Sequence, residues 1–149
     1  MKVIFTSDIH GKKELLNYIL ENYEADYYYD CGDSQLTNKE LKEFYSVMGN
    51  CDYEYFPYYR VVNVDDLNIL ITHGHLYTQN DLIKLSIINN CKIIVTGHTH
   101  IKKLEMKDNI YFLNPGSVSK PRGGNDKTFV IMEYNEDKKI SFEFIKISL

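Results

Sequence analysis

All five histidines of the chain lie in three short clusters, each beside a glycine or an aspartate. Asp8 precedes His10 by two residues, and the same spacing separates the histidines within the other two clusters. Side chains two residues apart in an extended chain point to the same side, so each pair can face one site. Imidazole nitrogens and carboxylate oxygens are ligands of Mn, Fe, Zn and Ni ions. The pairs that together predict a metal site are Asp8 with His10, His73 with His75, and His98 with His100.

The clusters follow apolar runs with the composition of buried strands, at residues 2–6, 68–72 and 92–96. Asp33 and Asn50 likewise follow predicted strands, at 27–29 and 45–48. Open α/β sheets place their sites at the carboxyl ends of strands. A single Asp there is more often a turn residue or helix cap, and a single His is more often an ordinary hydrogen-bonded group. The joint pattern favours one shared metal centre.

The spacing of apolar residues predicts helices over 12–23, from 38 to about 44, and after a cap at Thr78. The first half has the β-α-β-α-β order of a parallel sheet covered by helices. Further strands are predicted at 60–64, 110–113, 128–134 and 139–145, and near 104–106. We therefore expect an α/β protein, α+β by some schemes, in which two mixed sheets pack face to face with helices outside. One domain is expected to span residues 1–149.

The composition limits the classes of partner. The chain carries 17 Lys and Arg against 21 Asp and Glu, a formal net charge of -4, which argues against extended binding of nucleic acid. No apolar run approaches the roughly 18 residues of a membrane span, and the first five residues are too short for a signal peptide. We expect a cytoplasmic protein with no membrane partner. The three cysteines form no CxxC pair, so neither a disulfide framework nor a thiolate zinc site is indicated.

Six motifs in order and spacing resemble those of the calcineurin-like metallophosphoesterases, in particular the small bacterial and archaeal phosphodiesterase branch. The resemblance covers most of the chain, from Asp8 to about Arg122. Each motif alone is weak evidence, whereas six in order are specific. They are Asp8-Ile9-His10-Gly11, Gly32-Asp33, Gly49-Asn50-Cys51-Asp52, His73-Gly74-His75, Gly97-His98-Thr99-His100 and Asn114-Pro115-Gly116-Ser117.

The resemblance implies a four-layer αββα sandwich with a site for two divalent ions. Manganese is the expected metal, with nickel, iron, zinc or magnesium as alternatives. Two such ions bring a charge of +4 against -2 from two carboxylate ligands, which leaves positive charge to attract a phosphate. The implied ligands are Asp8, His10 and His100 for one ion and Asn50, His73 and His98 for the other, with Asp33 bridging them.

The implied activity is that of a metal-dependent phosphodiesterase, in which a hydroxide held between the ions attacks the phosphorus of a small phosphate ester. One alternative is a phosphomonoesterase, or a hydrolase of nucleotides or short nucleic acids, with the same site. A second is a non-catalytic protein-binding scaffold of the same fold, which the complete ligand set disfavours. A homo-oligomer is a further alternative to a single chain.

The sequence departs from larger relatives at Cys51 and Asp52, where many of them have a histidine followed by an acidic residue. That histidine is thought to protonate the leaving group, and a thiol with an ordinary pKa near 8.5 is a weak substitute. His75 either contacts substrate or supports the metal ligands, and the loop residue Arg122 either holds a phosphate oxygen or is solvated. The expected catalytic residues are Asp33, Asn50, Cys51, Asp52 and His75, and the expected substrate contacts are Asn50, His75 and Arg122.

Overall fold

The amino-terminal strand lies inside a four-stranded sheet. The computed structural model describes residues 1–148, and this first sheet has the strand order β2-β1-β8-β9. β1 pairs with β2 in parallel and with β8 antiparallel, and β9 is antiparallel to β8. The strands are β1 (Lys2–Thr6), β2 (Tyr27–Asp30), β8 (Thr128–Tyr134) and β9 (Ile140–Lys146).

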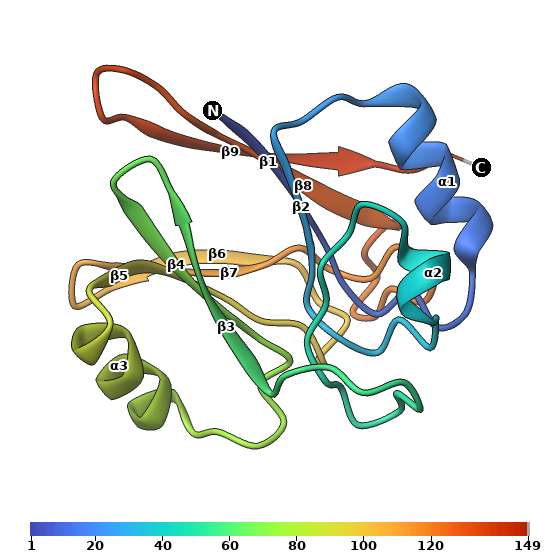
Figure 1. The fold of residues 1–149 in the computed structure, drawn as a ribbon, viewed down its shortest axis with the longest axis horizontal. Coiled ribbons are helices and arrows are strands. Elements are labelled where there is room, and N and C mark those ends of the chain that lie inside the picture. The colour runs from blue at the N-terminus through green and yellow to red at the C-terminus, as the bar shows by residue number, and fades with distance from the viewer. Residues whose placement is uncertain (149) are drawn as a thin grey trace.

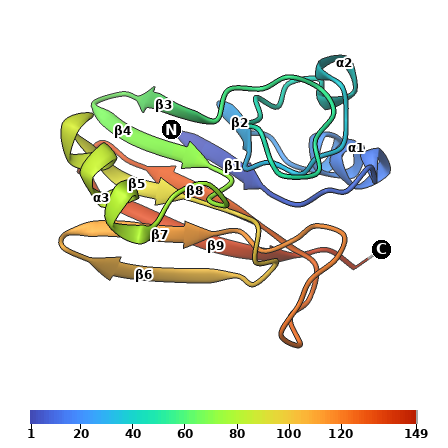
Figure 2. The same ribbon diagram turned by 90° about the horizontal axis from the view of Figure 1, so that it is seen from below.

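The second sheet has five strands in the order β3-β4-β5-β7-β6, which follow one another across the sheet in Figure 2. β4, β5 and β7 are parallel, while β3 and β6 are antiparallel edge strands. Their bounds are β3 (Tyr59–Val64), β4 (Leu67–Thr72), β5 (Cys91–Val95), β6 (Lys103–Lys107) and β7 (Ile110–Asn114).

Side-chain alternation along the strands separates three apolar layers. Val3 and Phe5 of β1 face the second sheet, and Ile69 and Ile71 of β4 meet them in the core between the sheets. The alternate residues of the first sheet, such as Ile4 of β1, point away from the second sheet. They form a second core under helices α1 (Lys13–Asn22) and α2 (Asn38–Leu41). A third core lies between the second sheet and helix α3 (Gln79–Ile88). Figure 1 shows α1 and α2 on one side of the two sheets and α3 on the other.

The predicted arrangement of two mixed sheets packed face to face with helices outside is confirmed. The predicted strand at 45–48 is wrong, because only Tyr45 forms an isolated bridge, to Tyr29 of β2. Beyond that bridge the Ser46 hydroxyl donates to the Asp30 carboxylate and the Met48 N–H donates to Pro57 O, so the segment follows a loop. The helix predicted to end near residue 44 ends at Leu41.

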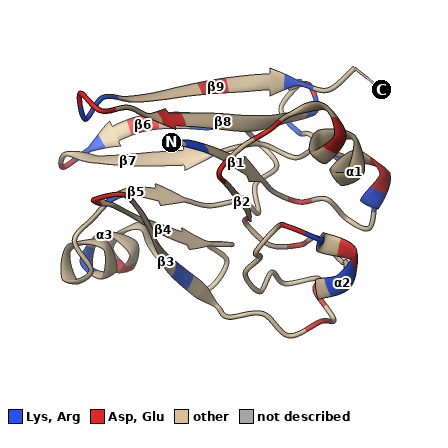
Figure 3. Ribbon diagram, turned by 45° about the horizontal axis from the view of Figure 1, so that its top comes forward, with Lys and Arg blue, Asp and Glu red and all other residues tan. Residues whose placement is uncertain are grey.

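Charged residues of both signs are interspersed along the helices and connecting turns of residues 1–148 (Figure 3). This distribution agrees with the small net charge of -4 and offers little support for extended binding of nucleic acid. In the described part of the chain, each helix is too short or too polar to cross a membrane.

Candidate metal centre

Loops at the carboxyl ends of parallel strands from both sheets meet at one place. The loop after β1 carries Asp8 and His10, and the loop after β2 carries Asp33. These loops are joined by hydrogen bonds from Asp8 N to Gly32 O (3.1 Å) and from His10 N to Asp33 O (3.0 Å). The loops after β4 and β5, which carry the other histidines, are joined by Gly97 N donating to His73 O (3.2 Å). The site therefore bridges the two sheets.

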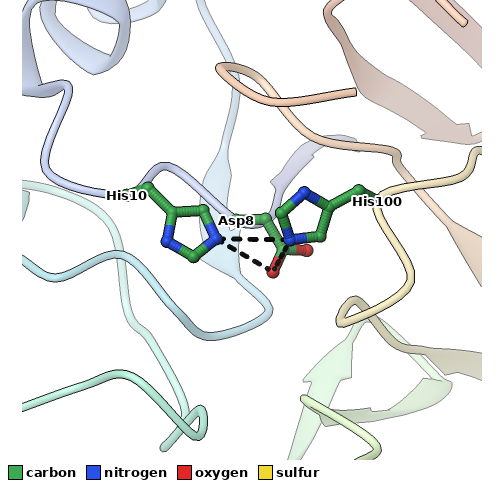
Figure 4. A group of neighbouring side chains, drawn as sticks. All are labelled: Asp8, His10 and His100. Atoms are coloured by element: carbon green, nitrogen blue, oxygen red, sulfur yellow. Dashed lines mark hydrogen bonds and ion pairs between the residues drawn. The ribbon is translucent and has the colours of Figure 1, made fainter. Parts of the chain in front are cut away.

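A first group of ligand atoms consists of Asp8, His10 and His100, whose donor atoms all lie within 4.8 Å of one another. Asp8 Oδ1 is 3.3 Å from His100 Nε2 and 3.8 Å from His10 Nε2, and the two ring nitrogens are 3.2 Å apart. Figure 4 shows both rings turned toward the Asp8 carboxylate, from loops far apart in the sequence. The structure thus brings these three predicted ligands together.

A second group consists of Asp33, His73 and His98, again within 4.8 Å. His73 Nε2 lies 3.2 Å from Asp33 Oδ2 and 3.3 Å from His98 Nδ1. The Asn50 side-chain oxygen is 3.0 Å from His73 Nε2 and 3.1 Å from His98 Nδ1, so it completes the predicted set. Asp33 also lies within 4.8 Å of a His10 nitrogen, which places its carboxylate between the two groups.

Hydrogen bonds on the outer side of the rings orient the two histidines of the first group. His10 Nδ1 donates to Gln35 Oε1 (2.7 Å) and His100 Nδ1 donates to Lys120 O (2.6 Å), so in neutral rings both Nε2 atoms are acceptors. Asp8 Oδ1 is buried and has no hydrogen-bond partner. Ligands on a tetrahedral ion with bonds of about 2.1 Å are ~3.4 Å apart, close to the separations found here. The residues present therefore fit divalent ions.

The charges at the site favour a cation in the second group. Burial raises the pKa of the Asp33 carboxyl, but hydrogen bonds from His73 and from the Cys51 N–H outweigh burial and hold the pKa at about 2. Burial lowers the pKa of His73, while Asp33 and Asp8 raise it, and the net direction is upward. The carboxylates that favour a proton on His73 would likewise favour a metal ion in its place.

The backbone at the ligands is not extended, contrary to the reasoning from spacing. Five ligand residues have positive φ, from 48° to 73°, a conformation that costs energy in residues other than glycine and clusters at functional sites. His98 and His100 accordingly point into different groups. These five residues are Asp8, His10, Asp33, His98 and His100.

Two glycines allow this close approach of loops. A Cβ atom on Gly97 would overlap Ser7 Oγ and lie 2.9 Å from Asp8 Oδ2. A Cβ atom on Gly49 would overlap Asp33 Oδ1 and lie 2.8 Å from Asp33 Cγ. Gly49 and Gly97 therefore lie directly against two of the predicted metal ligands.

Residues 1–137 match the family model of the calcineurin-like phosphoesterase superfamily domain. The chain belongs to the calcineurin-like phosphoesterase superfamily. The probable metallophosphoesterase YsnB of Bacillus subtilis (strain 168) is 32% identical over 150 residues, covering 92% of this chain and 86% of YsnB. Phosphodiesterase YfcE of Escherichia coli (strain K12) is 29% identical over 164 residues, covering 89% of this chain and 88% of YfcE.

The fold is shared with solved phosphoesterase structures. A conserved protein of Streptococcus pneumoniae TIGR4, described as a predicted phosphoesterase, superposes with a TM-score of 0.88 at 28% identity. That match covers 97% of this chain and 88% of the S. pneumoniae chain. The predicted family is therefore confirmed.

Cys51 and Asp52 of the Gly49–Asp52 motif have different surroundings. The Asp52 carboxylate accepts the N–H groups of Asp33 (2.9 Å), Gln35 (2.9 Å) and Gly49 (2.7 Å), so it fastens the loops and is not directed at Cys51. The Cys51 side chain is exposed, and its Sγ lies 3.4 Å from Asn50 Nδ2. Burial and the Asp33 carboxylate raise the pKa of Cys51, which disfavours a thiolate nucleophile in the metal-free protein.

His75 lies beside the second group of predicted ligands. Its ring centroid is 5.3 Å from that of His73 and 6.1 Å from that of His98. Its Nδ1 is buried without a hydrogen-bond partner, and burial together with the His73 and His98 charges lowers the pKa of His75. A neutral ring with a free nitrogen is suited to contact a ligand. Arg122 donates its backbone N–H to His100 O (3.0 Å), which ties its exposed loop to the first group.

Several residues that support the site carry no signal in the sequence. Gln35 lies outside the recognised motifs, and its side-chain oxygen accepts from His10 Nδ1 and so orients the His10 ring. Ser7 donates to Asp8 Oδ2 (2.7 Å), and Cys31 O accepts from His73 Nδ1 (2.8 Å). The Ser117 hydroxyl donates to Asp8 O (2.7 Å), so the Asn114–Ser117 motif supports a predicted ligand.

Proposed function

We propose that this protein is a metal-dependent phosphodiesterase that hydrolyses a small phosphate ester at a dinuclear centre. The observation that carries the proposal is that two groups of ligand atoms adjoin, with an Asp33 oxygen of the second group within 4.8 Å of a His10 nitrogen of the first. Membership in the superfamily supports phosphoester hydrolysis. The match to YfcE, named as a phosphodiesterase, supports a diester as substrate.

When bound, two divalent ions supply a hydroxide nucleophile and neutralise charge on the phosphoryl oxygens. The protein's own task is to hold the ligands at fixed positions. Asp8, His10 and His100 would hold one ion, Asn50, His73 and His98 would hold the other, and Asp33 would be available to both. Manganese is the expected native metal.

The surroundings of the ions favour an anionic substrate. Two carboxylates balance half of the charge of two divalent ions, and the remaining ligands are neutral. The Asn50 amide is part of the second group and the His75 ring lies beside it, so both can orient phosphoryl oxygens. Arg122 on the adjoining loop can pair with a further phosphoryl oxygen. The leaving group receives its proton from solvent, because the Cys51 thiol is a weak acid and the lowered pKa of His75 favours its neutral ring.

The other expectations belong to the same proposal. A monoesterase or a nucleotide hydrolase with the same site remains the main alternative, and the complete ligand set disfavours a non-catalytic scaffold. A single domain over residues 1–149, a cytoplasmic location and a homo-oligomer stay predictions.

The proposal is tested with paired aryl phosphate mono- and diesters, using metal-stripped protein with Mn, Ni, Zn or Mg added back. Diester hydrolysis should depend on added metal and should be lost in Asp33→Ala. The matched control is Asp137→Ala, which removes an exposed carboxylate from the turn between β8 and β9 and should retain activity. Activity that survives both chelation and Asp33→Ala would refute the two-metal assignment, and a preference for monoesters would refute the diesterase assignment.

A further inference from the structure

The exposed Cys51 thiol lies within reach of two ligands from different metal groups. Its Sγ, one His10 nitrogen and one Asp33 carboxylate oxygen all lie within 4.8 Å of one another. These three atoms meet the same distance criterion as the two groups described above. They form a third set of donors that is distinct in chemistry, because it alone contains sulfur.

Local hydrogen bonds hold the thiol in this position. The Cys51 N–H donates to Asp33 Oδ1 (2.8 Å), and the Asn50 amide contacts Sγ at 3.4 Å. His10 is oriented by Gln35 through Nδ1, so its Nε2 is the nitrogen that remains for a metal. Three backbone donors to Asp52 fix the loop on which Cys51 lies. The three donor atoms are therefore held near one another before a metal ion binds.

We propose that His10, Asp33 and Cys51 form an inhibitory site for one soft divalent ion such as Cd²⁺ or excess Zn²⁺. Thiolate ligands select soft ions, whereas Mn²⁺ and Mg²⁺ prefer oxygen and nitrogen. On binding, a sulfur–metal bond forms, the thiol proton passes to the buffer and no electron is transferred.

Occupation of this third site excludes the catalytic pair. The ion takes His10 from the first group and Asp33 from the second, so neither group keeps its full ligand set. The same chain thus has two metal states, a dinuclear one with harder ions and a mononuclear one held by sulfur. The consequence for activity rests on the proposed function, while binding through sulfur does not.

The test is a Cd²⁺ titration of the metal-stripped full chain, followed by the ultraviolet charge-transfer band of a sulfur–cadmium bond. The band should saturate at one thiolate per chain in the wild type and should be absent in Cys51→Ser and Cys51→Ala. The matched control is Cys91→Ser, a buried cysteine of β5 that should leave the band in place. Circular dichroism checks that each variant is folded. Absence of the band from the wild type, or its persistence without Cys51, would overturn the proposal.

A second measurement tests the exclusion. Cd²⁺ is added to Mn²⁺-loaded protein, and released Mn²⁺ is followed by electron paramagnetic resonance. Cys51→Ser should require at least tenfold more Cd²⁺ for the same release, since altering even an outer partner of a metal costs about 10–100-fold in affinity. Equal release from both proteins would refute the shared-ligand argument. If Mn²⁺-loaded protein without Cd²⁺ hydrolyses no phosphate ester while the sulfur–cadmium band forms in the metal-stripped protein, the proposed function alone is refuted.

Discussion

Replacing Asp30 by asparagine is expected to change how the stability of the protein depends on pH. Asp30 ends β2 and is 0% exposed. Its carboxylate accepts hydrogen bonds from the Thr6 hydroxyl (2.9 Å), the Ser46 hydroxyl (2.8 Å) and the Gly32 N–H (3.0 Å). Burial raises the pKa of Asp30 from 3.8 to about 7, even though the three donors lower it. The protonated form is therefore favoured in the folded protein at mildly acidic pH.

The direction of the effect follows from proton binding. In the unfolded chain Asp30 loses its proton near pH 3.8, and in the folded protein near pH 7. Between these values the folded state holds one more proton, so the stabilisation from Asp30 is present at low pH and lost as pH rises toward 7. About three pH units at about 1.4 kcal/mol each give a change of ~4 kcal/mol over the whole range. From about pH 5 to pH 8 the change is ~3 kcal/mol.

The assay is urea unfolding of metal-stripped wild type and Asp30→Asn at several pH values from 5 to 8. The free energy of unfolding of the variant, relative to wild type, should rise by ~3 kcal/mol over that range, since asparagine does not titrate. Other titrating groups are common to both proteins and cancel in the difference. Ser46→Ala serves as a control that removes one donor to the Asp30 carboxylate. Because that donor lowers the pKa of Asp30, the loss of stability should occur at higher pH in this variant. Parallel curves for wild type and Asp30→Asn, within about 0.5 kcal/mol, would refute the reasoning.

Three further substitutions test separate parts of the site. Gly97→Ala should lower Mn²⁺ affinity about 10–100-fold by calorimetry, because the added Cβ overlaps Ser7 Oγ behind Asp8; unchanged affinity would contradict this. Cys51→His should raise kcat/KM more for esters with poor leaving groups than for activated aryl esters, and an equal effect on both would remove the acid-catalysis explanation. Asp52→Asn should cost about 1–3 kcal/mol in urea unfolding, because an amide NH₂ replaces the oxygen that accepts from the Gln35 N–H. A loss below about 0.5 kcal/mol would show that these hydrogen bonds do not fasten the loops.

The sequence was informative where residue type and strand periodicity agree. The strand predicted at 128–134 is found with those bounds, since its alternating apolar residues face two different cores. The predicted ligands converge because parallel strands deliver their following loops to one edge of each sheet. Asp8 and His10 do come together, although through left-handed backbone and not through an extended chain.

Other features depend on tertiary contacts that produce no periodic pattern in the sequence. The segment 45–48 is mostly apolar like a strand, yet the Ser46 hydroxyl donates to Asp30 and the Met48 N–H donates to Pro57. Gln35 and the carbonyl of Lys120 orient ligand rings through contacts that span 25 and 20 residues of sequence. The third donor set, with Cys51, likewise becomes visible only when the loops after β1 and β2 and the Asn50 loop are placed together.

The most direct test of the central claim is the electron paramagnetic resonance spectrum of the protein loaded with Mn²⁺, recorded with the bound metal quantified. The position of the Asp33 carboxylate, in the second group and within 4.8 Å of a His10 nitrogen of the first, predicts two ions per chain. The ions should lie about 3.5–4 Å apart and give the spectrum of an exchange-coupled pair. Asp33→Ala should abolish the coupling. One ion per chain, or two ions that give uncoupled spectra, would contradict the dinuclear centre.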